Sequence, residues 1–593
     1  MPRLLTLLLR DRRAAVAPMV AGLGVALLAA SGLALDVGLH QLGNRDLRAA
    51  TEAAALAAAG NPAQAQARAR DYLTRNGYDP AVLQSVTVGR YCADARLAAD
   101  QRFDPSFSRC PGNGVANAVR IQTKTASRRF MTQVLGGAVV VPDLAATATA
   151  ARIDEAGVQV SSGLLTVNNA LVTTVNNLLG SLIGVQLILS TAQIEALMGG
   201  DVDAGIFFDK LAQRVGHTGT YGDLAAGTYS LQTIALAAAD AAAKPTTAAA
   251  LRVFGGQVGP GYQVPLKDLF GLGVWKNMPV GEANAAPALH AGINAYQLMS
   301  YAVQAGPTKV DLSNAVSLLV PVSTVKIGLA TSSTPGRPRF AFGPAGETSV
   351  FTAAMRLGIL IDLPVNIPLI ASVSVHLPIL IDVAAAKAEV TAIACASTAE
   401  QARDTTVAVR TTTGEINAYI GDTAFDPLAK TMPELNAGHI RQATIANVTL
   451  LPILGLPSLL DVKGSAVVQP VAGAASYPMA FGPGVGGPTA PGAPKTVGNS
   501  LSIGQTLGGL TAGLLSSNGL DIQVLGACLP LLCGAAKSLV RDTVLPAIVA
   551  PVTGLVGTVV DPLLNNVLAA LGVQLGHATV WVTGARCGVP VLV

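Results

Sequence analysis

Six cysteines are the residues of this 593-residue chain whose type and spacing most directly suggest chemistry. They are Cys92, Cys110, Cys395, Cys528, Cys533 and Cys587. The first two bracket a Pro/Asn/Gly-rich loop, the fourth and fifth bracket a short turn, and the other two stand apart. An even set indicates disulfides in an oxidising compartment, with the pairing left open, and six separate buried thiols are the alternative. Because no pair is spaced Cys-x-x-Cys and no histidine lies close by, we expect no zinc.

Two short motifs imitate binding sites. Asp104, Ser106 and Ser108 have the spacing of a metal-ion-dependent adhesion site, in which carboxylate and hydroxyl oxygens hold a divalent cation. Such a site follows a buried apolar strand, whereas the preceding residues here are polar, so we predict a solvated loop. Gly482, Gly484 and Gly487 satisfy the dinucleotide-binding spacing, but neither a strand before them nor a helix after them is predicted.

The remaining residues suggest no enzyme. The histidines are His40, His217, His290, His376, His439 and His577, and they are isolated from one another in the sequence. No nucleophile elbow, zinc-protease helix or phosphate-binding loop is present. We therefore expect no catalytic residue, no cofactor and no metal, although a triad assembled from distant residues would escape detection.

The first element that must position the rest is an uncharged run from Ala14 to Leu35. It is preceded by Arg10, Arg12 and Arg13, followed directly by Asp36, and long enough to cross a bilayer as a helix. The arginines predict a cytoplasmic N-terminus and an extracytoplasmic remainder. A cleaved signal peptide is the alternative.

The composition excludes one class of protein and one class of partner. Hydrophobic residues make up 51% of the chain and charged residues 12%, which excludes a solvated disordered protein. The net charge is +4, and no basic stripe accompanies aromatic residues, so we expect no nucleic-acid partner.

After the apolar run the chain predicts a helix on a small antiparallel sheet, an arrangement similar to that of pilins and pseudopilins. The expected helix Pro62–Arg75 ends at Asn76-Gly77, since glycine suits the position after a helix end. Alternation and composition predict further elements at 82–91 (strand), 118–125 (strand), 128–135 (helix) and 144–153 (strand).

The middle of the chain predicts mixed structure. A heptad-like tract at 164–184 is expected to be an amphipathic helix, followed by a short strand in VQLILS. Similar helix-then-strand patterns at 510–526 and 563–584 suggest an internal repeat. Further helices are expected at 207–215, 224–243 and 286–305, and strand-like runs at 310–329 and 355–383. Pro364, Pro368 and Pro378 lead us to expect short edge or bent strands in the last run.

The N-terminal residues also resemble a known family. The stretches RDRRAAVA (10–17), GLALDVG (32–38), LRAA (47–50) and AAALAAA (53–59) are similar to the Tad-like N-terminal segment of TadG-type proteins of the bacterial tight-adherence (Flp pilus) machinery. The stretches 134–150, 207–224 and 584–593 are similar to the same family. The resemblance implies a structural or assembly component whose partners are the inner membrane and other pilus-assembly or envelope proteins, with possible self-association.

Three departures refine that expectation. Glu52 stands where the family often has Asp, and Ala14 and Met19 stand where prepilin-peptidase processing needs Gly and Glu. An uncleaved anchor is therefore expected. The von Willebrand A domain of some TadG-type proteins is not expected, because Asp104, Ser106 and Ser108 lack their strand.

The combined prediction is an α+β protein with a long N-terminal transmembrane helix. Its expected parts are a cytoplasmic tip (1–13), a transmembrane helix (14–35), a pilin-like α+β domain (36–153), a central extracytoplasmic α+β region (154–468), a Pro/Gly-rich linker (469–500) and a C-terminal helix/strand region (501–593). The predicted function is a non-catalytic, single-pass inner-membrane component of a tight-adherence pilus system. A secreted or surface adhesin with a cleaved N-terminus is the alternative, and an envelope hydrolase is a third.

Overall fold

The structure is a computed structural model, and it describes part of the chain. The described residues are 16–94, 96–109, 116–130, 141–161, 169–281, 291–305, 309–311, 325–332, 337–368, 371–395, 405–428, 435–450, 459–472, 475–482, 493–498, 520–524, 538–544, 546–547, 554, 567–568, 570–571 and 576–593. The chain divides into two compact units, one of residues 1–153 with 588–593 and one of residues 154–587. The division falls within two long strands, β4 (Leu144–Ser161) and β27 (His577–Leu592).

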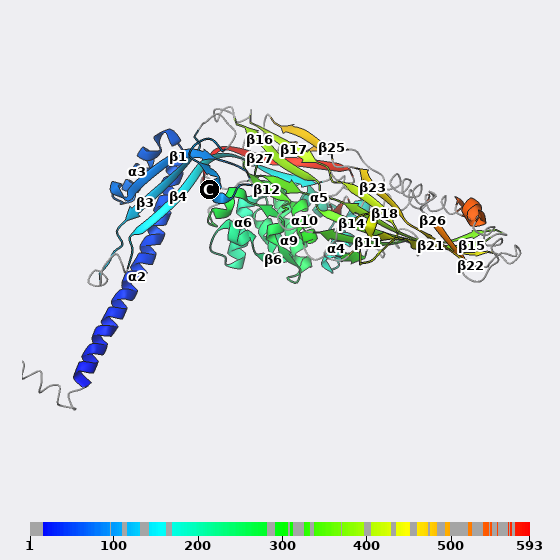
Figure 1. Ribbon diagram of the computed structural model, residues 1–593, viewed down its shortest axis with the longest axis horizontal. Helices are drawn as coiled ribbons and strands as arrows, with labels where there is room; N and C mark the ends of the chain where they lie inside the picture. Colours follow the sequence, from blue (N-terminus) through cyan, green and yellow to red (C-terminus); the bar gives the residue numbers. More distant parts are fainter. Residues whose placement is uncertain are drawn as a thin grey trace, which may run out of the picture. The chain divides into compact units, whose positions relative to one another are not determined.

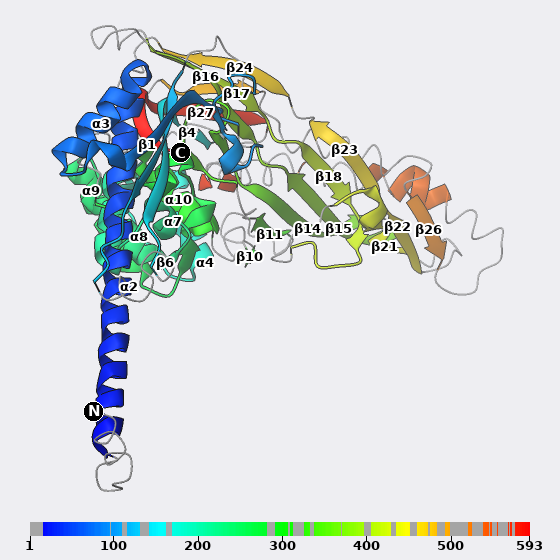
Figure 2. The ribbon, with the colours of Figure 1, turned by 60° about the vertical axis from the view of Figure 1, so that its left-hand side comes forward.

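Unit 1 is a long helix packed on an antiparallel sheet (Figure 1). Its helices are α2 (Val16–Ala59) and α3 (Ala65–Arg75), joined by the 3-10 turn Pro62–Gln64. Its sheet has the order β2 (Phe103–Asp104), β1 (Leu83–Tyr91), β3 (Ala118–Thr125) and the first part of β4. The figures show the C-terminal half of α2 along these strands and its N-terminal half projecting beyond them (Figures 1 and 2).

Alanine builds the interface between α2 and the sheet. Ala54, Ala55 and Ala58 of α2 are fully buried with Val119 and Ile121 of β3. Small side chains let the helix axis approach the strands closely, and the fully buried polar Thr51 hydrogen bonds to Thr123 Oγ1 at 2.6 Å. The alanine-rich tract is therefore a packing surface.

Several predictions for unit 1 are confirmed. The helix ending at Arg75 is present, and Gly77 has φ +81°, the left-handed conformation that follows a helix end. The strand 118–125 is β3, with buried Val119, Ile121 and Thr123 on one face. The helix expected at 128–135 is wrong for Arg128–Phe130, which are not helical, and its other residues lie outside the described part.

A block of helices forms the first part of unit 2. It comprises α4 (Asn169–Ile183), α5 (Thr191–Met198), α6 (Ala204–Val215), α7 (Tyr221–Ala225), α8 (Leu231–Asp240), α9 (Pro245–Val258) and α10 (Ala295–Ala305). Two-stranded pairs accompany it, namely β5 (Asp201–Asp203) with β9 (Gly292–Asn294) and β6 (Thr228–Ser230) with β7 (Gln263–Pro265). Aromatic rings fill its core, with Phe270 5.0 Å from Phe208 and 5.5 Å from Phe340 between centroids.

Several expectations for the helices and strands of this block need correction. The helix expected at 224–243 is divided into α7 and α8 by β6, α9 was not foreseen, and the helix expected from Ala286 begins at Ala295 among the described residues. VQLILS is not a strand. The side-chain amide of Asn176 hydrogen bonds to both backbone groups of Leu189, and that of Gln257 to both of Ile188. These side-chain amides make the hydrogen bonds that a neighbouring strand would make, because an amide has an N–H donor and a C=O acceptor as a peptide group does.

Two sheets of unit 2 share an apolar core. One contains β8 (Phe270–Gly271), β12 (Phe340–Gly343), β25 (Lys495–Gly498) and the unit 2 parts of β4 and β27. The other has the order β13 (Ser349–Phe351), β16 (Lys387–Ala394), β17 (Thr406–Thr412) and β24 (Ser476–Phe481). Val158 and Val580 from the first sheet join Val390, Val409 and Phe481 from the second in one buried cluster.

A third sheet is built on a long hairpin, β14 (Ala354–Ile367) and β15 (Ala371–Val383). Its other strands are β10 (Lys309–Asp311), β11 (Val325–Ser332), β18 (Ile416–Ile420), β21 (Ala443–Leu450), β22 (Leu459–Gly464), β23 (Ala466–Ala472) and β26 (Leu520–Val524). A separate pair joins β19 (Asp422–Thr423) and β20 (Ile440–Arg441).

The expectation of short, bent strands around the prolines is wrong. Pro378 lies inside β15, where pairing to β21 has ended at Val375 and pairing to β18 begins at Ile379. Pro364 lies in β14 beyond Ile361, the last residue that pairs with β11. Each proline therefore occupies a point where a neighbouring strand is missing, so its lost N–H breaks no ladder.

The predicted linker 469–500 is also wrong in part. Ser476–Phe481 forms β24 and pairs with β17, and Lys495–Gly498 forms β25 and pairs with β27. Gly482 has φ +102°, and Gly484 and Gly487 lie outside the described residues. Of the proposed repeat, the strands β26 and β27 are present, whereas most of the expected helical residues at 510–519 and 563–575 lie outside the described part.

Candidate functional site

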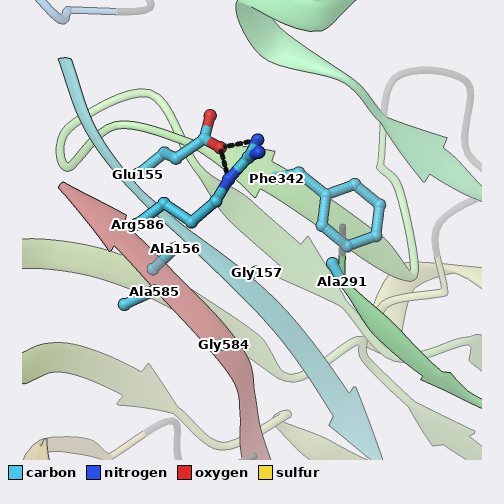
Figure 3. Close-up of a pocket in the computed structure, with 8 residues that line it drawn as sticks. All are labelled: Glu155, Ala156, Gly157, Ala291, Phe342, Gly584, Ala585 and Arg586. Carbon is cyan, nitrogen blue, oxygen red and sulfur yellow. Dashed lines mark hydrogen bonds and ion pairs between the residues drawn. The ribbon is translucent and has the colours of Figure 1, made fainter. Parts of the chain in front are cut away.

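The most unusual side-chain cluster of unit 2 surrounds Glu155, a carboxylate on β4 with 4% of its surface exposed. Glu155 Oε2 accepts a hydrogen bond from Trp275 Nε1 at 2.6 Å. Its Oε1 accepts one from Arg586 Nε at 2.7 Å and a second from Arg586 Nη2 (Figure 3). The guanidinium carbon of Arg586 lies 4.7 Å from the centre of the Trp275 ring.

Three separate elements position this cluster. Glu155 comes from β4, Arg586 from β27, and Trp275 from the 3-10 helix Gly273–Asn277 of the helical block. Because β4 and β27 are paired strands, their side chains reach each other directly. The cluster thus joins both strands to the helical block through charge-assisted hydrogen bonds and a cation–π contact.

Burial dominates the electrostatics of Glu155. Desolvation raises the pKa of its carboxyl group, while the Arg586 charge and the hydrogen bonds from Arg586 and Trp275 oppose that rise. An ion pair this deeply buried is costly to assemble and more costly to break singly, since either partner alone would be an unpaired buried charge.

The cavity beside the cluster is small. It is lined by Glu155, Ala156, Gly157, Ala291, Phe342, Gly584, Ala585 and Arg586, and its volume is about 10 Å³ (Figure 3). A cavity of that size holds about one water molecule. A Cβ on Gly157 would overlap Thr583 Oγ1, so only glycine lets the strand pass here. The cluster therefore has the geometry of a structural latch, with no room for an organic substrate.

A disulfide lies next to this latch. Cys395 and Cys587 are bonded, with their Cα atoms 5.9 Å apart and a sequence separation of 192. The carboxylate of Asp154 lies within 4.8 Å of both sulfurs. Sulfurs bonded to each other are not thiolate ligands, so this trio is no metal site in the oxidised protein. Cys92 is disulfide-bonded as well, and Cys110, Cys528 and Cys533 lie outside the described residues.

The Asp104 motif organises its own loop. Asp104 Oδ1 accepts hydrogen bonds from the backbone N–H and the hydroxyl of Ser106, and Oδ2 accepts one from the Arg109 N–H at 2.6 Å. Asp104 is fully buried, so the predicted solvated loop is wrong for this residue. Its oxygens are committed to the turn, in which Phe107 has φ +58°.

The residues used for topology have different outcomes. Arg10, Arg12 and Arg13 lie outside the described residues. Asp36 lies on α2 with none of its surface exposed, and its Oδ1 accepts the backbone N–H of Phe130 at 3.0 Å. The acidic residue that follows the apolar run is therefore covered by unit 1.

The described histidines are distributed among unrelated contacts. His40 Nδ1 lies 3.3 Å from Ser127 Oγ, and His376 Nδ1 lies 2.6 Å from Asp362 Oδ1, both exposed side chains of the β14–β15 hairpin. The His439 ring lies edge-on to Phe425, and burial lowers the pKa of His577. His290 lies outside the described residues. Near His217, the hydrogen bonds from Thr220 and the His217 charge lower the pKa of the Asp223 carboxyl group.

The sequence alone did not identify Glu155, Trp275 and Arg586. Glu155 marks the start of a long uncharged stretch, which is the one signal that could have drawn attention to it. Its partner is 431 residues away, and no spacing rule predicts such a pairing.

Comparison with known proteins gives one partial match. Residues 172–304 match a family model described as a domain of unknown function, DUF8293. These residues coincide with the helical block from α4 to α10. Neither the curated proteins nor the solved structures give a match.

Proposed function

We propose that this protein is a membrane-anchored, extracytoplasmic structural or assembly component of a bacterial tight-adherence pilus system, without catalytic activity. The observation that carries the proposal is the division of α2 into an exposed apolar half and a half packed on a sheet. The wider pilus assignment rests on the family resemblance of the N-terminal segment.

The exposed half of α2 supports a lipid environment. Among the described residues, one helix is long and apolar enough to cross a membrane, from Met19 to Ala59. Met19, Leu23 and Val25 are each about two-thirds exposed or more. Large apolar side chains at this density on one helix are unfavourable in water and favourable in lipid.

The packed half of α2 supports an anchor rather than a removable leader. The helix continues without a break from the apolar residues to Ala59, whose neighbours Ala54, Ala55 and Ala58 are part of the core of unit 1. Cleavage after the apolar run would cut a helix whose C-terminal half belongs to the folded unit. The unbroken helix favours retention of the span.

The Glu155 cluster and the disulfide of unit 2 fit a structural protein of an oxidising compartment. The Glu155 cluster fills its surroundings and leaves a cavity for about one water molecule. The Cys395–Cys587 disulfide fits an oxidising, extracytoplasmic compartment.

Deleting the gene in its own bacterium tests the pilus role. The expected result is loss of surface pili, restored by the wild-type gene and by the gene that carries His376→Ala, a substitution at an exposed side chain of β15. Wild-type piliation in the deletion strain would overturn the pilus assignment. Recovery of the protein in the soluble fraction would overturn the anchor and favour the secreted adhesin.

A further inference from the structure

Exposed apolar side chains in unit 1 mark a surface beyond the helix itself. Among its described residues, the large apolar side chains that are exposed lie on α2 between Met19 and Leu42, with one exception, Phe130. Phe130 is 64% exposed, and Leu42 is 59% exposed. Leu42 follows the uncharged run of α2 in the sequence, and Phe130 lies beside Asp36, the first residue after that run.

Two hydrogen bonds fix the height of Phe130 along α2. Its backbone N–H donates to Asp36 Oδ1, and Ser127 Oγ lies 3.3 Å from His40 Nδ1, one helical turn further along. Residues 127–130 therefore run beside the helix from His40 down to Asp36. Phe130 stands at the level where the most apolar part of the helix gives way to polar residues.

Helix length places this level relative to a bilayer. From Val16 to Leu35 the helix rises roughly 29 Å at 1.5 Å per residue, which matches a hydrocarbon core of about 30 Å. Asp36 to Leu42 adds roughly 9 Å, somewhat more than one headgroup region of about 5–7 Å. A helix spanning the core with residues 16–35 thus holds Phe130, at the level of Asp36, among the headgroups, and holds Leu42 just beyond them.

The charges near Phe130 are mainly basic. Arg128 is exposed, and Lys124 and Arg129 both pair with one carboxylate, that of Asp143. Three basic side chains face two carboxylates, those of Asp143 and Asp36, which leaves an excess of one positive charge beside an exposed aromatic ring. That combination suits anionic phospholipid headgroups, which attract basic residues while apolar side chains enter the interface.

We propose that residues 127–130 form a second membrane contact, in which Phe130 inserts into the headgroup region and Arg128 binds anionic phospholipid. This inference rests on the proposed membrane anchor. The contact fixes the height and rotation of unit 1 on the bilayer, and the buried Asp36 carboxylate is satisfied by protein rather than by water at the membrane surface.

Depth-dependent quenching of tryptophan tests the contact on the full chain. Each tryptophan variant is reconstituted in vesicles of equimolar phosphatidylcholine and phosphatidylglycerol, with or without bromine on the lipid chains. The wild-type protein, which carries Trp275 and Trp581, gives the background fluorescence. The added tryptophan of Phe130→Trp is expected to emit at shorter wavelength than one exposed to water, and its intensity is expected to be lower in brominated than in unbrominated lipid. The matched control is Gln66→Trp, exposed on α3 near the other end of α2, which is expected to lose no intensity.

Flotation of the same vesicles separates two kinds of failure. If the protein floats and Phe130→Trp is quenched no more than Gln66→Trp, the second contact is wrong and the anchor stands. If the protein does not float, both are wrong. In vesicles of phosphatidylcholine alone, quenching of Phe130→Trp is expected to fall, and Arg128→Gln is expected to remove this dependence on lipid charge. Equal quenching in both lipids would contradict the anionic-headgroup assignment.

Discussion

Helices α2 and α10 show opposite relations between polarity and burial. α2 exposes its most apolar half, whereas all eleven residues of α10 are buried, including Gln297, Ser300 and Gln304. Gln304 Nε2 donates to the Leu571 carbonyl at 2.8 Å, whereas the side-chain carbonyl oxygens of Gln297 and Gln304 are buried without a hydrogen-bond partner among the described residues. The exposed half of α2 calls for lipid, and α10 is stabilised by hydrogen bonds inside unit 2.

The two units extend this contrast. Unit 1 packs α2 on its sheet through alanines, and unit 2 buries a salt bridge between Glu155 and Arg586. Substitutions at the exposed apolar residues of unit 1 should therefore change membrane retention, and substitutions at the buried polar residues of unit 2 should change the free energy of unfolding.

The largest effect is expected in the exposed half of α2. Leu27→Asp combined with Leu28→Asp should cost about 5–7 kcal/mol of membrane insertion, because each central Asp costs about 2.5–3.5 kcal/mol. The share of protein in the membrane fraction should fall to background. Gln66→Asp combined with Ala67→Asp, on the exposed face of α3, is the control and should leave it unchanged. Continued membrane retention of the α2 variant would contradict the claim that the exposed half of α2 lies in lipid.

The buried salt bridge should give the next effect. Arg586→Leu leaves Glu155 as an unpaired buried carboxylate and is expected to destabilise unit 2 by about 3–5 kcal/mol in urea unfolding. Replacing both residues, by Glu155→Leu and Arg586→Leu, should cost less than the single change, because no lone charge stays buried. A double variant less stable than Arg586→Leu would contradict this description of the latch.

The alanine interface should be sensitive to size. Ala54→Leu inserts a larger side chain between α2 and β3 and should destabilise unit 1 by about 1–3 kcal/mol. Ala26→Leu makes the same change in the exposed half and should have no measurable effect on unfolding. Equal effects at the two positions would mean that the halves do not differ in packing.

The smallest effect is expected within α10. Tyr296→Phe removes the hydroxyl that donates to the Ala570 carbonyl at 2.7 Å, at a cost of about 1 kcal/mol in urea unfolding. Burial raises the pKa of Tyr296, which keeps this donor protonated. Tyr72→Phe on α3 is the control, since its hydroxyl bonds to no described residue. A loss at Tyr72 equal to that at Tyr296 would remove the assigned role of the hydrogen bond.

The sequence predicted the elements of unit 1 better than those of unit 2. Local signals suffice where Gly77 ends a helix and where β3 alternates on one face. They fail where the decisive partner is distant. Asn176 and Gln257 imitate a strand beside Leu189 and Ile188, and Pro378 sits in a central strand because β21 has already ended. Proline rules alone cannot reveal where a neighbouring strand stops.

The candidate site was even less accessible to sequence reasoning. Glu155 and Arg586 are 431 residues apart, and Trp275 belongs to a third element. The cysteines were recognisable as an even set, but the partner of Cys395 follows from the fold alone.

N-terminal sequencing of the protein from carbonate-washed membranes tests the central claim most directly. The chain in this fraction is expected to retain the residues before Asp36, since α2 holds the protein in the bilayer and continues unbroken into unit 1. A mature chain that begins near Asp36 and is recovered in the soluble fraction would contradict the anchor.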